Sequence, residues 1–182
     1  ADFVGTTKDL RFDEAYLRGL LDIQHGDARC RSVLNLLYPD LNENLQFDID
    51  HLHPKSAFER TALNRQQFLK DNPELRKFYE NRVNWNSIAN LHLLNTSQNR
   101  SKQDKPLALW MTQSDVGFRM ADLLLAPEDS LAFENFSTFC EKRKRGLLQR
   151  LRANVVMTDE LAPTVETLDE MDEPESVEQM AG

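Results

Sequence analysis

The chain has 182 residues, of which 40% are hydrophobic and 29% are charged, and its formal net charge is −8 at pH 7. This composition is ordinary for a globular protein, and the length is enough for one sizeable domain. No run of about 18 apolar residues occurs, so we expect no membrane-spanning helix. The two cysteines, Cys30 and Cys140, form no CxxC pair. A structural zinc site is therefore not expected, whereas a reducing, cytoplasmic compartment is.

The acidic residues are concentrated at one end of the sequence. Residues 158–182 contain nine acidic residues and no Lys or Arg, which leaves 21 acidic and 22 basic residues in 1–157. We expect one domain over residues 1–157 and an acidic, disordered tail over 158–182. Because clustered cations act over about 10 Å, the nearly neutral domain could still bind nucleic acid. A second hypothesis places the tail in the DNA groove as an autoinhibitor.

The first half of the chain is predicted to hold helices on either side of one strand. Apolar residues recur at helical spacing from Leu10 to Leu21 and again in CRSVLNLLY, residues 30–38. The stretch LQFDIDHL, residues 45–52, alternates apolar and polar residues, which predicts a half-buried strand. Residues 59–80 have a helical pattern again, interrupted at Pro73.

The second half is predicted to hold a second strand and three more helices. The stretch IANLHLL, residues 88–94, is short and apolar like a strand, and Asn95, Thr96 or Ser97 can cap a following helix. Pro106 suits the first turn of another helix, and residues 130–155 have the pattern of a long amphipathic one. The predicted fold is α+β and mostly helical, with a small core of two strands and a helix at about 45–106.

Four side chains around this predicted core have the chemistry that phosphodiester hydrolysis requires. Asp50 ends the first strand and can ligate a hard cation, while the imidazole of His51 can accept a proton from water. The helix after the second strand brings the amide oxygen of Asn99, a neutral ligand for the same ion. Lys102 follows about one helical turn later and could hold a phosphate.

The same residues resemble a known family. The stretch DHLHP, residues 50–54, followed by SIANLHLLNTSQNRSK, residues 87–102, is similar to the HNH (ββα-metal) endonuclease motif of RNA-guided CRISPR effector nucleases. In both, an Asp-His pair precedes a Pro, and two asparagines stand nine positions apart, as Asn90 and Asn99 do here. An Arg follows the second Asn, and a Lys follows two positions later. The overall layout resembles the C-terminal HNH domain of GmrSD-type restriction and antiphage defence proteins.

The resemblance implies a role for each matching residue. His51 would be the general base, Asp50 and Asn99 would hold one Mg²⁺ or Mn²⁺ ion, and Asn90 would hold the loop that aims the base. Lys102 would contact the scissile or an adjacent phosphate, and Arg100 would bind DNA. GmrSD-type proteins usually carry an N-terminal ParB-like domain, so the resemblance implies such a partner domain outside this chain.

The sequence also departs from the family pattern. Asn99 stands where many HNH proteins have a third histidine, which shifts the expected metal from zinc towards Mg²⁺ or Mn²⁺. The insert between His51 and Asn90 is longer than in compact HNH motifs, and the zinc-knuckle cysteines of many phage-type members are absent.

Several other residues have two interpretations. His53 either lines the site and touches DNA or makes a structural hydrogen bond, and His92 either faces the site or is a half-buried core residue. A zinc site of Asp50, His51, His53 and His92 is a further alternative, disfavoured because adjacent strand residues point to opposite faces. His25 is interpreted as a loop residue without a function.

A basic segment in the predicted last helix also has two interpretations. It either contacts DNA phosphates or is a solvated helix face, and it contains Lys142, Arg143, Lys144 and Arg145.

The sequence therefore predicts a divalent-metal-dependent DNA endonuclease domain of the HNH type. One such site cuts one strand, so a monomer is expected to nick DNA. The resemblance implies a bacterial setting in which invading DNA is restricted. The alternative is a catalytically inactive HNH-like module that binds DNA or a partner without cutting.

Overall fold

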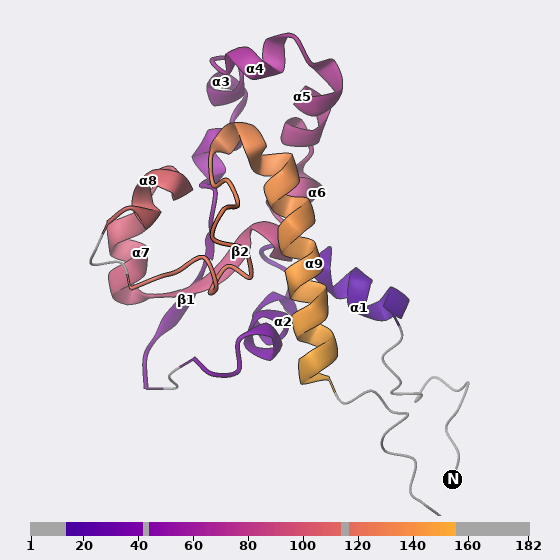
Figure 1. Ribbon diagram of the computed structural model, residues 1–182, viewed down its shortest axis with the longest axis vertical. Coiled ribbons are helices and arrows are strands. Elements are labelled where there is room, and N and C mark those ends of the chain that lie inside the picture. Colours follow the sequence, from indigo (N-terminus) through magenta and orange to yellow (C-terminus); the bar gives the residue numbers. More distant parts are fainter. Residues whose placement is uncertain (1–13, 42–43, 114–116, 156–182) are drawn as a thin grey trace, which may run out of the picture.

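The computed structural model describes residues 14–41, 44–113 and 117–155 (Figure 1). The fold is α+β and mostly helical, as predicted. Within these residues no helix is both long enough and apolar enough to cross a membrane. The elements in chain order are α1 (Glu14–Leu21), α2 (Cys30–Leu37), β1 (Phe47–His51), η1 (Lys55–Phe58), α3 (Arg60–Leu63), α4 (Gln67–Lys70), α5 (Pro73–Glu80), α6 (Arg82–Trp85), η2 (Ile88–Asn90), β2 (Leu91–Asn95), α7 (Thr96–Lys102), α8 (Leu107–Met111), η3 (Phe133–Asn135) and α9 (Phe136–Asn154).

Helix α9 is the longest element and contacts both hydrophobic cores of the protein. Its second half packs against α1 and α2, whereas its first half faces α5 and the aromatic side chains around it (Figure 1). We call the group around α1 and α2 the first core; it includes Leu147, Leu148 and Leu151 of α9. We call the other group the second core; it includes Phe136, Phe139 and Cys140 of α9. One helix thus joins the two cores.

Strands β1 and β2 form a two-stranded antiparallel sheet that lies between these cores. The register pairs Phe47 with Asn95 at one end and His51 with Leu91 at the other. Alternate residues point to opposite faces, so Phe47 and Ile49 pack onto the first core while Asp48 and Asp50 share the other face. The strand period therefore places two carboxylates side by side on the face opposite the first core.

Helix α7 begins directly after β2 and packs back against β1. Asn95 caps it: the Asn95 side chain accepts from the Gln98 amide at 2.9 Å, and the Gln98 side chain accepts from the Asn95 amide at 3.1 Å. This capping box satisfies two amide groups that a helix end would otherwise leave without partners. Strand β2 therefore ends at Asn95 and α7 begins at Thr96 with no residue between them, which fixes how α7 lies on the sheet.

Three predicted elements differ from the structure in their extent. The second strand begins at Leu91, because Ile88–Asn90 form the turn η2. Residues 59–80 form three short helices, and the last long helix begins at Phe136 after the turn η3. The predicted acidic tail, 158–182, and the start of the first predicted helix lie outside the described residues.

Two glycines in helices differ in their surroundings. Gly146 lies in α9, where a Cβ atom would stand 2.5 Å from the Leu124 carbonyl oxygen and 2.9 Å from the Leu124 Cβ. Gly19 lies in α1 with nothing within 4 Å of the same position. Leu124 itself has a positive φ of 59°. The missing side chain at Gly146 therefore allows this loop to lie directly against α9.

We predict that alanine has opposite effects at these two positions. Gly19→Ala should raise the free energy of unfolding by about 0.5–1 kcal/mol, because alanine favours the helical backbone. Gly146→Ala should lower it by about 1–3 kcal/mol, because the clash with Leu124 outweighs the helical preference. Urea denaturation of both variants at pH 7 measures this. Stabilisation by both would contradict the packing of the Leu124 loop on α9.

Candidate active site

The candidate site lies where β1 ends beside α7. The Lys102 ammonium donates to the Asp50 carboxylate at 2.7 Å and to the His51 carbonyl oxygen at 2.6 Å. Lys102 is fully buried, while the Asp50 side chain retains 26% of its exposure. The ammonium therefore neutralises Asp50 and ties α7 to the last residues of β1. In this arrangement Lys102 faces the protein interior, which argues against the predicted phosphate contact.

Asn90 holds the loop that follows β1. Its side-chain oxygen accepts from the His53 amide at 2.9 Å, and its side-chain nitrogen donates to the carbonyl oxygens of His53 at 3.0 Å and Trp85 at 2.9 Å. Its own carbonyl oxygen accepts from the Leu52 amide at 2.8 Å. Asn90 is fully buried, so these bonds are shielded from water. Asn90 therefore holds the chain just after His51 through both its side chain and its main-chain carbonyl oxygen.

Asn99 faces β1 one turn before Lys102. Its amide nitrogen lies 3.3 Å from a carboxylate oxygen of Asp48. Asp48, Asp50 and Asn99 thus lie along the side of β1 that α7 covers. Rotation of the Asn99 amide by half a turn would present its oxygen instead of its nitrogen. Two carboxylates and an amide oxygen are hard donors, so these side chains fit Mg²⁺ or Mn²⁺ better than zinc.

The zinc alternative has no support in the described part of the chain. There, no group of three or more His, Cys, Asp or Glu side chains is arranged so that it could hold a metal ion. His53 and His92, two of the four residues considered for it, are each enclosed elsewhere. The oxygen donors of Asp48, Asp50 and Asn99 form a different group, because one of its three members is an amide.

His51 is buried, and its ring is surrounded by residues from two other segments of the chain. The Nε2 atom lies 3.0 Å from the Asn86 side-chain oxygen. The ring centroid is 5.0 Å from that of His25 and 6.0 Å from that of Trp85. Burial lowers the pKa of His51 below its ordinary value, and the hydrogen bond to Asn86 opposes this shift. His51 is therefore neutral at pH 7, the state that a proton acceptor requires.

His53 and His92 are buried, neutral core residues. The His53 ring packs edge-on against Phe136 and Phe139, and its Nε2 atom has no hydrogen-bond partner within the described residues. Burial, followed by the charge of Lys102, lowers the pKa of His53 to about 3. Burial, followed by Arg143, lowers the pKa of His92 to about 3 as well. With 1% of its surface exposed, His53 does not present its ring to DNA here, which corrects that prediction.

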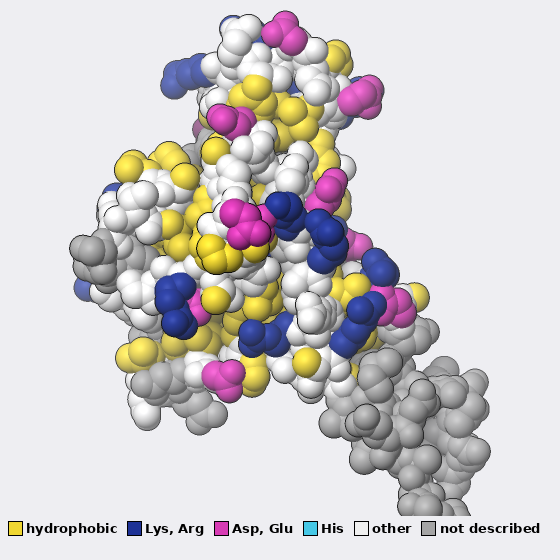
Figure 2. Space-filling model, viewed as in Figure 1, with side chains coloured by type: hydrophobic (Ala, Val, Ile, Leu, Met, Phe, Trp, Pro, Cys, Tyr) yellow, Lys and Arg dark blue, Asp and Glu magenta, His cyan; other side chains and the backbone are white. Residues whose placement is uncertain are grey.

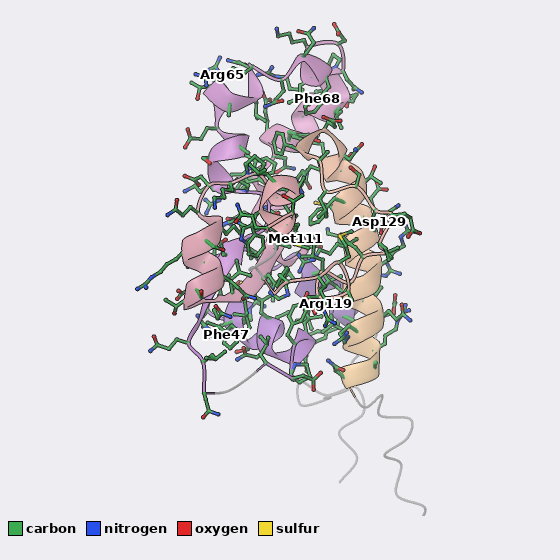
Figure 3. The ribbon with its side chains drawn as sticks, turned by 60° about the vertical axis from the view of Figure 1, so that its left-hand side comes forward. Phe47, Arg65, Phe68, Met111, Arg119 and Asp129 are labelled. Atoms are coloured by element: carbon green, nitrogen blue, oxygen red, sulfur yellow. The ribbon has the colours of Figure 1, made fainter. Side chains whose placement is uncertain are left out.

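The basic segment of α9 is not a continuous phosphate-binding face. Arg143 is fully buried, and its guanidinium donates to three carbonyl oxygens and the Tyr38 hydroxyl, so its prediction as a DNA contact is wrong. Lys142 pairs with Asp129, which lies beside α9 (Figure 3), and Lys144 pairs with Asp22 at 2.9 Å. Arg145 is exposed. Figure 2 shows basic and acidic side chains interspersed over this side of the molecule, as on a solvated helix face.

The structure adds three residues that sequence reasoning did not place in the site. Asp48 could have been found, because it lies two positions before Asp50 in a strand and so shares its face. Asn86 lies in the insert between the two motif halves, where no spacing rule applies. His25 is 26 positions before His51 in sequence, and nothing in the sequence around it indicates the contact.

We predict that His53 makes the free energy of unfolding decrease as the pH falls. Its pKa is about 3 in the folded protein and about 6.5 in the unfolded chain. The unfolded chain therefore gains a proton first as the pH falls. The stability due to neutral His53 is complete above about pH 6.5 and decreases by about 1.4 kcal/mol per pH unit towards pH 3. His53→Leu should remove this contribution.

Urea denaturation at pH 7 and pH 5 measures the effect. The unmodified chain should lose about 2 kcal/mol more than His53→Leu between these values. At pH 7 the variant should fold well, because replacement of the His53 ring by an apolar group breaks no side-chain hydrogen bond to Nε2. Equal losses in both proteins would show that His53 is not buried as a neutral ring.

Comparison with models of known protein families gives no match for the chain, and comparison with curated proteins gives none either. The HNH resemblance therefore depends on the residues that carry it and stays a prediction. What the structure adds is their arrangement: Asp50, Asn90 and Lys102 are gathered around the end of β1 that carries His51, while Asn99 contacts Asp48 earlier in the same strand.

Proposed function

We propose that the chain is a divalent-metal-dependent DNA endonuclease domain of the HNH type. One observation carries the proposal: two antiparallel strands and the helix that follows them bring the motif residues together across 50 intervening positions. Lys102 of α7 bonds to both Asp50 and the backbone of His51. This contact joins the two halves of the motif that the sequence analysis matched separately.

His51 is suited to the role of general base. It is neutral at pH 7, because burial lowers its pKa, and 8% of its surface remains exposed. A neutral imidazole can accept the proton of a water molecule that attacks a phosphodiester. Asn90 supports this role indirectly, because its hydrogen bonds to the His53 backbone hold the chain next to His51 in position.

Asp50 and Asn99 would hold the Mg²⁺ or Mn²⁺ ion, with Asp48 within reach of the same side. When bound, such an ion supplies positive charge that stabilises the developing charge on the phosphate and the leaving oxygen. Lys102 limits the net negative charge at Asp50 and keeps the carboxylate in place. Arg100 is exposed on α7 and is the motif cation available to a DNA phosphate.

The wider setting comes from the resemblance alone. A single site implies nicking of one strand, and GmrSD-type proteins imply a bacterial defence protein that restricts invading DNA. In that setting a ParB-like domain would be linked to this one.

A second candidate function, binding without cutting, is supported by a separate observation. The ammonium of Lys102 already pairs with Asp50 at 2.7 Å and is fully buried, so a metal ion would have to share that carboxylate with a cation. An HNH-like module that binds DNA or a protein partner without cutting would need no such sharing. The two functions differ in whether the site cuts DNA.

We predict that the chain nicks supercoiled plasmid DNA when Mg²⁺ or Mn²⁺ is present. His51→Ala should abolish nicking, a loss of at least about 100-fold, because it removes the general base. The readout is the conversion of supercoiled to open circles on a gel, with an EDTA control. His53→Leu is the matched histidine control and should retain activity. DNA binding without cutting by the unmodified chain would favour the second candidate.

We predict that Arg100 and Lys102 differ in their effects on DNA binding. Arg100→Met should weaken binding and reduce the salt dependence of log K by about 0.9, the value for one phosphate contact. Lys102→Met should leave the salt dependence unchanged but lower the free energy of unfolding by roughly 1–3 kcal/mol, since Asp50 loses its partner. Fluorescence anisotropy of labelled DNA at several salt concentrations, together with urea denaturation, measures both. A reduced salt dependence for Lys102→Met would restore it as a phosphate contact.

A further inference from the structure

The hydrogen bond between His51 and Asn86 determines which ring nitrogen carries the proton. The Asn86 side-chain oxygen lies 3.0 Å from His51 Nε2. An amide oxygen can only accept a hydrogen bond, so Nε2 must be the donor. A neutral imidazole has one N–H, and the other nitrogen then holds a lone pair. In this geometry the proton-accepting atom of His51 is therefore Nδ1.

Other bonds fix the orientation of the Asn86 amide. Its nitrogen donates to the His25 carbonyl oxygen at 3.3 Å, which leaves its oxygen directed at His51. The main chain of Asn86 is also held: its carbonyl oxygen accepts from the His25 backbone amide at 2.8 Å, and its backbone amide donates to the Arg82 carbonyl oxygen at 2.9 Å. Asn86 has 3% of its surface exposed. A half-turn of its amide would place two donors at His51 and break the bond to His25.

The loop between α1 and α2 supports this arrangement. Gln24 pairs with Ser87 in an antiparallel bridge, and the Ile88 amide donates to the Ile23 carbonyl oxygen at 3.1 Å. Residues 23–25 therefore run alongside 86–88 and hold Asn86 in place. The same loop brings the His25 ring to 5.0 Å from the His51 ring, which limits its rotation.

The three buried histidines differ in the partners of their ring nitrogens. Both nitrogens of His92 face carbonyl oxygens, those of Leu93 at 2.8 Å and Asp122 at 3.2 Å. The His53 ring is enclosed by phenylalanines. Within the described residues, the His51 ring alone is bonded to an acceptor side chain that is itself held by a separate chain segment. This is the arrangement expected of an imidazole that must keep one nitrogen ready to accept a proton.

We propose that Asn86 is a positioning residue for His51: it accepts the Nε2 hydrogen, keeps the Nδ1 lone pair available, and is itself held by the loop that contains His25. The assignment of Nδ1 as the base rests on the proposed function. The hydrogen bond and its effect on the ring do not. Asn86 touches neither substrate nor metal in this scheme and acts only through His51.

The first experiment is NMR of the ring nitrogens and their protons in the metal-free chain of residues 1–182 at pH 7.5. His51 should give an Nε2–H signal that exchanges slowly with water, because the hydrogen bond is buried. Asn86→Leu removes the acceptor and should abolish this protection. Asn86→Asp keeps an acceptor oxygen and should retain the signal, shifted downfield by the charge-assisted hydrogen bond. Asn84→Leu, which removes a bond from the Asn84 side chain to the Phe78 carbonyl oxygen, should leave the signal unchanged.

The second experiment is the nicking rate of the same variants under saturating DNA. Asn86→Leu should lower the rate about 10- to 100-fold, by analogy with residues that orient metal-binding side chains through a hydrogen bond. DNA affinity should stay unchanged. Asn86→Asp should recover most of the rate, whereas Asn84→Leu should match the unmodified chain.

The two experiments separate the two claims. A His51 ring protonated on Nδ1, or a protected Nε2–H that persists unchanged in Asn86→Leu, would overturn the assignment of Asn86. If Asn86→Leu does not fold, Asn86→Asp decides, and an Nε2–H signal at the position seen in the unmodified chain would overturn it. If the signals behave as expected but no protein cuts DNA, Asn86 positions His51 while the proposed nuclease function fails.

Discussion

The site and both cores depend on the hydrogen bonds of the buried Arg143 guanidinium. It lies in α9 between the residues that enter the second core and those that enter the first. It donates to the carbonyl oxygens of Ala89 and Leu91, which flank Asn90, at 3.1 and 2.9 Å. Burial of a cation is costly unless its donors are satisfied. The backbone around Asn90 must therefore keep its conformation for Arg143 to stay hydrogen-bonded. Asn90 in turn holds the loop after His51. The geometry of the site therefore depends on Arg143 of α9, which bonds to the backbone on both sides of Asn90.

Two buried cations also set the electrostatics around the strand ends. Lys102 is neutralised by Asp50, whereas Arg143 is bonded to carbonyl oxygens and a hydroxyl. Each adds to the effect of burial on a nearby histidine, Lys102 on His53 and Arg143 on His92. A protonated ring at either position would place a second positive charge in the interior, where charges interact strongly. These two buried cations thus help to keep the rings of His53 and His92 neutral.

The sequence was most informative where a short period or a cap decides local structure. Alternation in residues 47–51 predicted β1, and the polar residues after Leu94 predicted the start of α7, where Asn95 is the cap. The sequence was least informative about burial. Lys142 to Arg145 look alike in sequence, yet one is buried and its neighbours are not. The turn at Ile88–Asn90 was predicted as strand, because its apolar residues do not reveal that Asn90 bonds to the loop after β1. Contacts such as His25 with Asn86 join segments 61 residues apart, and no local pattern encodes them.

The dependence on distant segments bears on where the functional unit ends. The motif residues lie between 45 and 106, but Leu91 and Leu93 pack onto the first core with α1 and α2, while Leu94 packs onto the second. A piece limited to the motif would expose these leucines and lose Arg143 from the turn at Asn90. It would also lose residues 23–25, which hold Asn86 beside His51. The helical flanks are therefore part of the site, because they supply both the apolar surface that fixes the strands and the hydrogen bonds that orient the His51 ring.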